Sequence, residues 1–203
     1  MTYAGVFALK SKISASNTLI ANCGFYAAAL LVGGEYEFIH STIANFWGGY
    51  SRKPRSTSSV VISNVLIVNQ TDGTKTTYAG NLVKAKFGNC IIFGNNLNEL
   101  EFGRSDKAEF NYFFDHCIIQ VADTFKTSDK LHYRNIWKGN SYNPKFKSLD
   151  VKDYNYELDT LSPAKDIGST EYSLLFPFDI KNKDRTADAG PDLGAYERIE
   201  KKK

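Results

Sequence analysis

The sequence predicts an all-β protein built as a solenoid, a coil of stacked strands with about five turns of 23–27 residues. Aromatic residues are abundant, with 14 Phe and 12 Tyr against a single Met, a composition that favours strands. Long helix-forming runs of Leu, Ala, Glu and Lys are missing. A short apolar stretch also recurs five times at nearly constant spacing. These observations together favour one domain of stacked strands.

The recurring stretch reads NTLIAN, HSTIAN, NVLIVN, NCIIFG and HCIIQV in chain order. It opens each time with Asn or His, at Asn17, His40, Asn64, Asn89 and His116. Three residues later each copy carries an isoleucine, at Ile20, Ile43, Ile67, Ile92 and Ile119. Because side chains alternate between the two faces of a strand, we expect these isoleucines to stack inside the protein.

The opening Asn and His residues predict corners between strands. Both residue types are enriched among non-glycine residues with positive φ. The positions therefore form a structural corner ladder: Asn17, His40, Asn64, Asn89 and His116. The alternative, a catalytic or metal-binding pair of His40 and His116, stays open.

This repeat resembles the right-handed parallel β-helix proteins of the pectin-lyase-like superfamily over about residues 13–121. The segment that follows reads NPKFKSLDVKDYNYELDTLSPAKDIGS and later FDIKNKDRTADAGPDLGAYE. It resembles the C-terminal part of secreted and surface β-helix proteins of the choice-of-anchor Q type. The resemblance implies rungs with long loops over residues 1–142. It implies a final rung and a C-terminal cap of the same domain over residues 143–203.

Charge pairing is expected to hold this cap together. Its charged residues are Asp166, Asp179, Arg185, Asp192 and Glu197. Arg185 is expected to be buried and bonded to at least one of the carboxylates, because a buried guanidinium without partners is too costly. Asn182, where the family usually has Gly, is expected to keep a positive φ. A calcium site is the alternative, but the spacing fits no calcium loop, so we expect no metal or other cofactor.

Two pairs of residues are candidates for catalysis. Glu99 and Glu101 are two apart in a predicted strand, at a separation that glycoside hydrolysis allows. Lys84 and Lys86 form a second outward pair that could complement an acidic sugar or act as a lyase base. The alternative for both pairs is an ordinary solvated face.

Aromatic residues in two predicted loops are candidates for sugar binding. Trp47 and Tyr50 lie beside Arg52, Lys53 and Arg55, and a later loop carries Tyr133 and Trp137. Exposed aromatic faces beside polar groups suit sugar rings. Packing of the loops onto the coil is the alternative.

Charge and cysteine usage set the remaining expectations. The net charge of +3 is too small to indicate nucleic acid as a partner. No apolar run is long enough to span a membrane, and the three cysteines do not indicate a disulfide framework. The resemblance implies a secreted or cell-surface protein. Because repeats begin close to Met1, the N-terminal end is expected to continue into, or pack against, another polypeptide.

The function expected from these patterns is that of the C-terminal part of a β-helix protein, a non-catalytic carbohydrate-interacting or structural module. A polysaccharide would be its partner. A polysaccharide lyase or glycoside hydrolase is the first alternative, and an adhesin-like stalk is the second. Whether the chain is an enzyme stays open at this point.

Overall fold

The computed structural model describes residues 3–48 and 55–200. Strands dominate it, with one short α-helix and one 3-10 turn. The elements are β1 (Ala4–Ser16), β2 (Leu19–Ala21), β3 (Tyr26–Ile39), β4 (Thr42–Asn45), β5 (Val60–Ser63), β6 (Val65–Asn69), β7 (Lys75–Ala79), β8 (Leu82–Gly88), β9 (Ile91–Gly94), β10 (Leu100–Gly103), β11 (Phe110–Ile119), β12 (Tyr133–Lys138), η1 (Asn140–Tyr142), β13 (Phe146–Ser148), β14 (Asn155–Leu158) and α1 (Thr170–Leu175).

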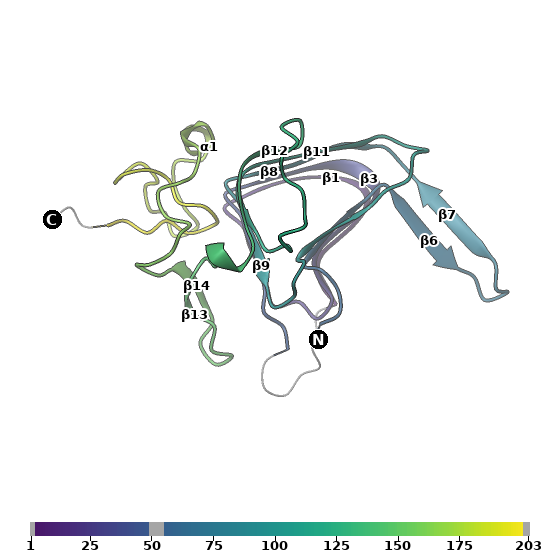
Figure 1. Cartoon of the computed structure of the whole chain (residues 1–203), viewed down its shortest axis with the longest axis horizontal. Coiled ribbons are helices and arrows are strands. Elements are labelled where there is room, and N and C mark those ends of the chain that lie inside the picture. Colours follow the sequence, from purple (N-terminus) through teal and green to yellow (C-terminus); the bar gives the residue numbers. More distant parts are fainter. Residues whose placement is uncertain (1–2, 49–54, 201–203) are drawn as a thin grey trace.

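Ten of the strands form one sheet. Its order is β10-β5-β3-β8-β11-β9-β4-β2, with β1 beside β3 and β12 beside β11. The pairings within it are parallel. Figure 1 shows these strands curving together around the centre of the molecule, with the β6–β7 hairpin projecting to one side. The C-terminal segment, with β13, β14 and α1, lies on the other side.

The predicted right-handed parallel β-helix with short rungs is wrong. The strands belong to one large sheet, and β1 and β3 are 13 and 14 residues long. The prediction missed this length because bulges let these strands bend without ending. The register of β1 and β3 shifts between Leu9 and Ser11, where Lys10 has a φ of 45°. In β3 the bend falls at Val32, Gly33 and Gly34, all with positive φ.

The isoleucine column is present at four of its five predicted positions. Ile20 pairs with Ile43, Ile43 with Ile92, and Ile92 with Ile119, all in parallel register and all buried. Ile67 departs from the column and is 58% exposed. It lies in β6, which pairs antiparallel with β7 around a turn with Gly73 at a φ of 84°. The third repeat copy is therefore a hairpin strand.

Stacked rings form a second column of the main core. Phe38, Phe87, Phe114 and Tyr133 follow one another across neighbouring strands, with centroid distances of 5.2, 4.8 and 5.9 Å. Their planes are within 14° of parallel. Each ring covers the face of the next, so the interior of the sheet is filled without helices.

The C-terminal segment packs on the corner side of the sheet. Its apolar residues Phe146, Tyr156 and Leu193 share a core cluster with Ile91 and Ile118 of the sheet. Helix α1 begins after Ser169, whose hydroxyl accepts a hydrogen bond from the backbone N–H of Glu171. This cap satisfies one of the free N–H groups at the start of a short helix.

Candidate functional site

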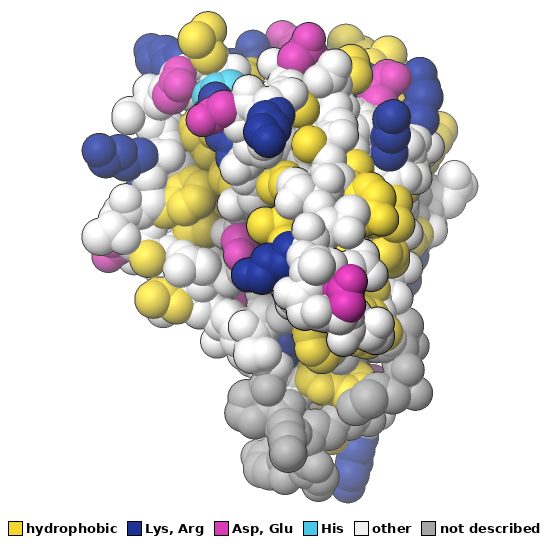
Figure 2. All heavy atoms as spheres, turned by 90° about the vertical axis from the view of Figure 1, so that its right-hand side faces the viewer, with side chains coloured by type: hydrophobic (Ala, Val, Ile, Leu, Met, Phe, Trp, Pro, Cys, Tyr) yellow, Lys and Arg dark blue, Asp and Glu magenta, His cyan; other side chains and the backbone are white. Residues whose placement is uncertain are grey.

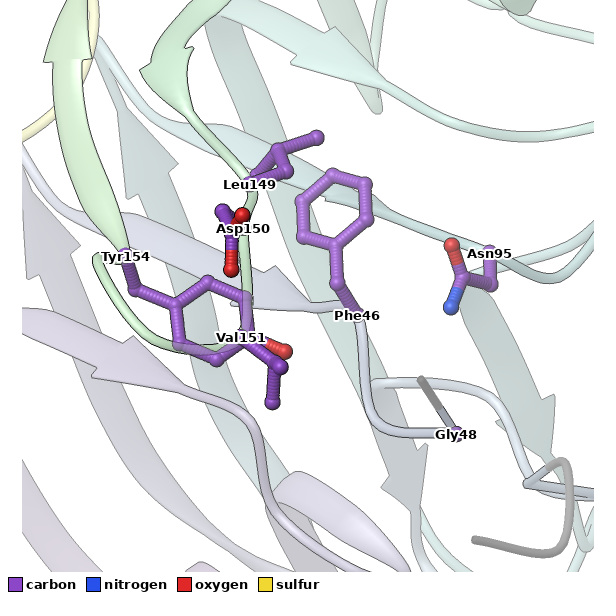
Figure 3. A pocket seen from close by; sticks show the side chains of 7 residues that line it. All are labelled: Phe46, Gly48, Asn95, Leu149, Asp150, Val151 and Tyr154. Carbon is purple, nitrogen blue, oxygen red and sulfur yellow. The ribbon is translucent and has the colours of Figure 1, made fainter. Parts of the chain in front are cut away.

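A hollow of 390 Å³ opens between three segments that are far apart in the sequence. They are the loop after β4, the residue after β9 and the turn joining β13 to β14. The hollow is lined by Phe46, Gly48, Asn95, Leu149, Asp150, Val151 and Tyr154. Figure 3 shows the rings of Phe46 and Tyr154 on either side of Asp150, with Asn95 beyond Phe46.

The rings of Phe46 and Tyr154 are held by an aromatic cluster behind them. Phe46 meets the ring of Phe146 edge-on at 6.1 Å and stacks on Tyr156 at 6.4 Å. Tyr154 also stacks on Tyr156, at 5.9 Å and within 8° of parallel. Both rings are half-buried, so each keeps part of its surface toward the hollow. The apolar wall is thus placed by packing before any ligand arrives.

Polar groups of the hollow come from Asp150 and Asn95, which are both exposed. The carboxylate of Asp150 accepts a hydrogen bond from the backbone N–H of Lys152 through Oδ1, at 2.9 Å. The amide of Asn95 donates to the carbonyl oxygen of Trp47 at 3.5 Å. Among the described residues, Oδ2 of Asp150 and Oδ1 of Asn95 have no hydrogen-bond partner. These two oxygens can accept hydrogen bonds from hydroxyl groups of a ligand.

A buried ion pair fixes the loops on either side of the hollow. Arg55 Nη2 lies 2.6 and 2.8 Å from the two carboxylate oxygens of Glu99, and both side chains are almost fully buried. The same nitrogen donates to the carbonyl oxygen of Asn45, at 3.1 Å, just before Phe46. Glu99 also contacts Gly94, where a Cβ atom would lie 2.3 Å from Oε1. Glycine is therefore needed for the carboxylate to sit so close to β9.

The predicted carboxylate pair is separated by this arrangement. Glu99 is fully buried and accepts hydrogen bonds from Arg55, from the backbone and hydroxyl of Ser59, and from the backbone of Asn96. Glu101 is exposed and lines a different hollow, beside Ser58 and Phe125. The two carboxylates do not face a common space, so they lack the arrangement that glycoside hydrolysis needs.

The predicted pair of lysines lies in a lattice of surface ion pairs. Lys84 Nζ lies 3.8 and 3.6 Å from carboxylate oxygens of Glu35 and Glu37, and Lys86 Nζ lies 3.7 Å from Glu37. Lys86 Nζ also lies 4.8 Å from the centroid of the Tyr172 ring. The positive charges of both lysines are therefore balanced by carboxylates on β3. Figure 2 shows charged side chains of both signs dispersed over one face of the molecule, with apolar side chains between them.

The described members of the predicted sugar-binding aromatics, Trp47, Tyr133 and Trp137, do not form one site. Trp47 is half-buried next to Phe46, whereas Tyr50 with Arg52 and Lys53 lies outside the described residues. Tyr133 is only 5% exposed, because Phe114 covers one face of its ring. Trp137 is half-buried and packs against the core cluster that the C-terminal segment shares with the sheet. We therefore leave Tyr133 and Trp137 out of the candidate site.

The corner ladder has the expected backbone at four of five positions. Asn17, His40, Asn89 and His116 have φ values of 47–50°. Asn64 does not, because it begins the β6–β7 hairpin and its amide bonds to the carbonyl oxygens of Ser105 and Ala108.

The side chains of the ladder hold the C-terminal segment. Asn89 exchanges two hydrogen bonds with the backbone of Ser169, at 2.8 and 2.9 Å. His40 Nε2 lies 3.1 Å from the hydroxyl of Ser173. Asn17 accepts from Arg185 at 2.9 Å and donates to the carbonyl oxygen of Phe178 at 2.8 Å. These contacts give the ladder a structural role that the repeat alone did not indicate.

The expected ion pair of Arg185 is present. Arg185 is fully buried, and its Nη1 lies 3.1 Å from Oε2 of Glu197. Asp179 and Asp192 bind backbone N–H groups: Asp179 accepts from Glu197 at 2.7 Å, and Asp192 accepts from Asp166 at 2.9 Å. Asp166 has a φ of 58° and Asn182 a φ of 62°, the latter as expected. The carboxylates thus fix an irregular chain by accepting its free N–H groups.

Burial shifts the pKa values of ionisable side chains where the C-terminal segment meets the ladder. It raises the pKa of Glu197 to about 8, helped by the nearby Asp192 and opposed by Arg185. It raises the pKa of Asp192 to about 7. The same burial lowers the pKa of His40 to about 2, and the positive charge of Arg185 acts in the same direction. His40 is therefore neutral at physiological pH and suits a packed corner.

A His40→Asn variant is expected to show by how much the buried imidazole lowers the free energy of unfolding at acid pH. Below pH 6.5 the unfolded chain binds a proton at His40, whereas the folded chain does so only near pH 2. The free energy of unfolding of the wild type should therefore fall, relative to the variant, by up to about 1.4 kcal/mol per pH unit as the pH decreases from about 6.5. Urea unfolding of both proteins at pH 7.5, 5.5 and 4.5 measures this difference. A difference that does not change with pH would contradict it, since both proteins share Asp192 and Glu197.

Metal ligands, cysteines and membrane spans complete the description of the chain. Within residues 3–48 and 55–200, no group of three or more His, Cys, Asp or Glu side chains is placed to hold a metal ion. Cys23, Cys90 and Cys117 are free and buried. None of the helices in the described part of the chain is long and apolar enough to cross a membrane.

Residues of the hollow at Phe46, Asn95, Asp150 and Tyr154 were not singled out from the sequence. Asp150 and Tyr154 belong to the segment that resembles a cap, for which the sequence predicts a covering role and no binding site. One signal could have indicated an exposed binding surface: the hairpin turn carries the apolar residues Leu149 and Val151 beside charged residues.

The fold and the hollow together define an all-β protein with a large parallel sheet and an aromatic-walled surface site. Comparison with protein-family models, curated proteins and solved structures finds no match for this chain. The likeness to the pectin-lyase-like superfamily and to choice-of-anchor Q proteins therefore rests on the sequence motifs.

Proposed function

We propose that this protein is a non-catalytic carbohydrate-binding module and that the hollow between Phe46 and Tyr154 binds a polysaccharide. The observation that carries this proposal is the combination of fixed aromatic rings with two oxygens that accept hydrogen bonds. C–H faces of a sugar stack on aromatic rings, and its hydroxyl groups donate to carboxylate and amide oxygens. A surface or extracellular location, where polysaccharides occur, forms part of the proposal.

The charge of the hollow favours a neutral sugar. Among the described residues that line the hollow, Asp150 is the one that carries a charge. A carboxylate would repel a uronate or a sulfated sugar, whereas it accepts hydrogen bonds from neutral hydroxyl groups. The lyase or hydrolase alternative gains no support from the predicted catalytic pairs. Glu99 and Glu101 are separated, and Lys84 and Lys86 form ion pairs with glutamates of β3.

A Tyr154→Ala variant is expected to bind a neutral oligosaccharide about tenfold more weakly, the equivalent of about 1.4 kcal/mol, because it loses one stacking face. A screen of neutral and acidic glycans first identifies the ligand, and calorimetry then compares the variants. Tyr78→Ala is the control, since Tyr78 is 49% exposed on β7, outside the hollow. Binding of acidic glycans alone, or equal loss in both variants, would refute the proposal. Release of reducing ends from the bound glycan would instead show an enzyme.

A further inference from the structure

The free edge of β1 borders a third hollow, of 470 Å³, at the end of the sheet. Apolar side chains of β1, β2 and β3 line it, among them Ile13, Ala15, Leu19, Ile20 and Phe38, and none of the lining residues that the structure describes is charged. Among the described residues β1 pairs with β3 alone. Phe7 and Leu9 on this strand are 54% and 48% exposed. A long apolar edge of this kind is a template for pairing with another strand.

The column of stacked rings stops at this edge. Ala15 is the β1 partner of Phe38, so the position next to the last ring of the column carries only a methyl group. Phe38 and Ala15 both line the hollow. A ring on a strand added beside β1 can enter the space left by Ala15 and continue the column.

A column of alternating charges ends at the same edge on the outer face. Lys12 pairs with Glu35 at 3.0 Å, and Glu35 lies 3.8 Å from Lys84. The register places Lys12 opposite Glu35 and Glu35 opposite Lys84. The side chain of Lys12 is 75% exposed, so an acidic residue on an added strand would continue the alternation.

We propose that the edge of β1 over residues 11–16 binds an extended polypeptide segment as an added parallel strand. The segment carries an acidic residue opposite Lys12, an apolar residue opposite Ile13 and an aromatic residue opposite Ala15. A polypeptide fits better than a glycan because a strand edge offers regularly spaced backbone N–H and C=O groups. A second copy pairing β1 with β1 fits less well, because lysines at positions 10 and 12 of both strands would then lie close together. This surface is separate from the proposed sugar site.

Labelled peptides test the proposal by fluorescence anisotropy with the whole chain. The peptide TEVTFT matches the three requirements, and TKVTFT and TEVTAT each change one of them. We expect TEVTFT to bind at least fivefold more tightly than either. Lys12→Glu should reverse the preference between TEVTFT and TKVTFT. Lys130→Glu, at an exposed lysine outside the edge, should leave it unchanged.

Two further measurements decide the outcome. Hydrogen exchange should show that TEVTFT protects backbone amides of residues 11–16 while the affinity for the glycan is unchanged. Absence of binding at millimolar peptide, equal affinity of the three peptides, or an unchanged preference in Lys12→Glu would overturn the proposal. A dimer in sedimentation equilibrium that buries β1 would overturn it in favour of a second copy.

Discussion

Replacing Arg185 with alanine is expected to lower the free energy of unfolding by roughly 3–5 kcal/mol at pH 9, where the buried Glu197, whose pKa is raised to about 8, is ionised and loses its cation. The guanidinium also donates to Asn17 on the sheet and to the carbonyl oxygen of Gly194, at 2.9 and 3.2 Å. It therefore joins the C-terminal segment to the first corner of the ladder. Its loss should loosen that segment before the sheet.

Hydrogen exchange on Arg185→Ala measures this order. Amides of residues 160–197 should lose protection to a greater degree than those of β8 and β9. Arg104→Ala is the matched control, since the side chain of Arg104 is 68% exposed and its partner Asp106 is 97% exposed. The control should change the free energy of unfolding by less than about 0.5 kcal/mol. Equal loss of protection in both regions would show that Arg185 stabilises the whole protein and not the C-terminal segment in particular.

A Glu99→Gln substitution is expected to cost about as much, roughly 3–5 kcal/mol, because it leaves Arg55 buried without its counter-ion. Glutamine also replaces one acceptor oxygen by an NH₂ group. In the wild type, Oε2 accepts from both the backbone and the hydroxyl of Ser59, at 2.8 and 2.6 Å. At least one of these hydrogen bonds would be lost.

The same substitution should weaken binding at the proposed sugar site. Arg55 holds the carbonyl oxygen of Asn45 next to Phe46, so a displaced guanidinium would release the loop that carries this ring. Denaturant unfolding and glycan calorimetry on Glu99→Gln measure the two effects. Glu101→Gln, at an exposed neighbour, is the control and should change neither. An unfolding free energy within about 0.5 kcal/mol of the wild type would show that the ion pair is not needed.

The sequence by itself predicted features that depend on single residues and their close neighbours. Alternation along a strand reports which side chains point inward, so the register of Ile20, Ile43, Ile92 and Ile119 was predictable. Conformational preference predicted the positive φ of the Asn and His corners at four positions. The cost of burying an unpaired charge predicted a partner for Arg185.

The failed predictions concern where strands end and with which strands they pair. Alternation continues through a bulge, so the bends at Lys10 and at Val32–Gly34 hid the length of β1 and β3. At Ile67 a signal was available, because Asp72 and Gly73 form a dipeptide that is typical of hairpin turns. The repeat pattern outweighed it.

Only the tertiary structure decided which distant residues meet. The hollow joins Phe46, Asn95 and Tyr154 from three separate segments, and the ion pair of Arg55 with Glu99 joins two residues that are 44 positions apart. No local pattern encodes such pairs, because their geometry depends on how the sheet curves and how the C-terminal segment packs on its corners. The sequence therefore determined the inward and outward faces of the strands. Long-range packing decided that Glu99 is a structural ion-pair partner and that Phe46 and Tyr154 form the wall of a surface site.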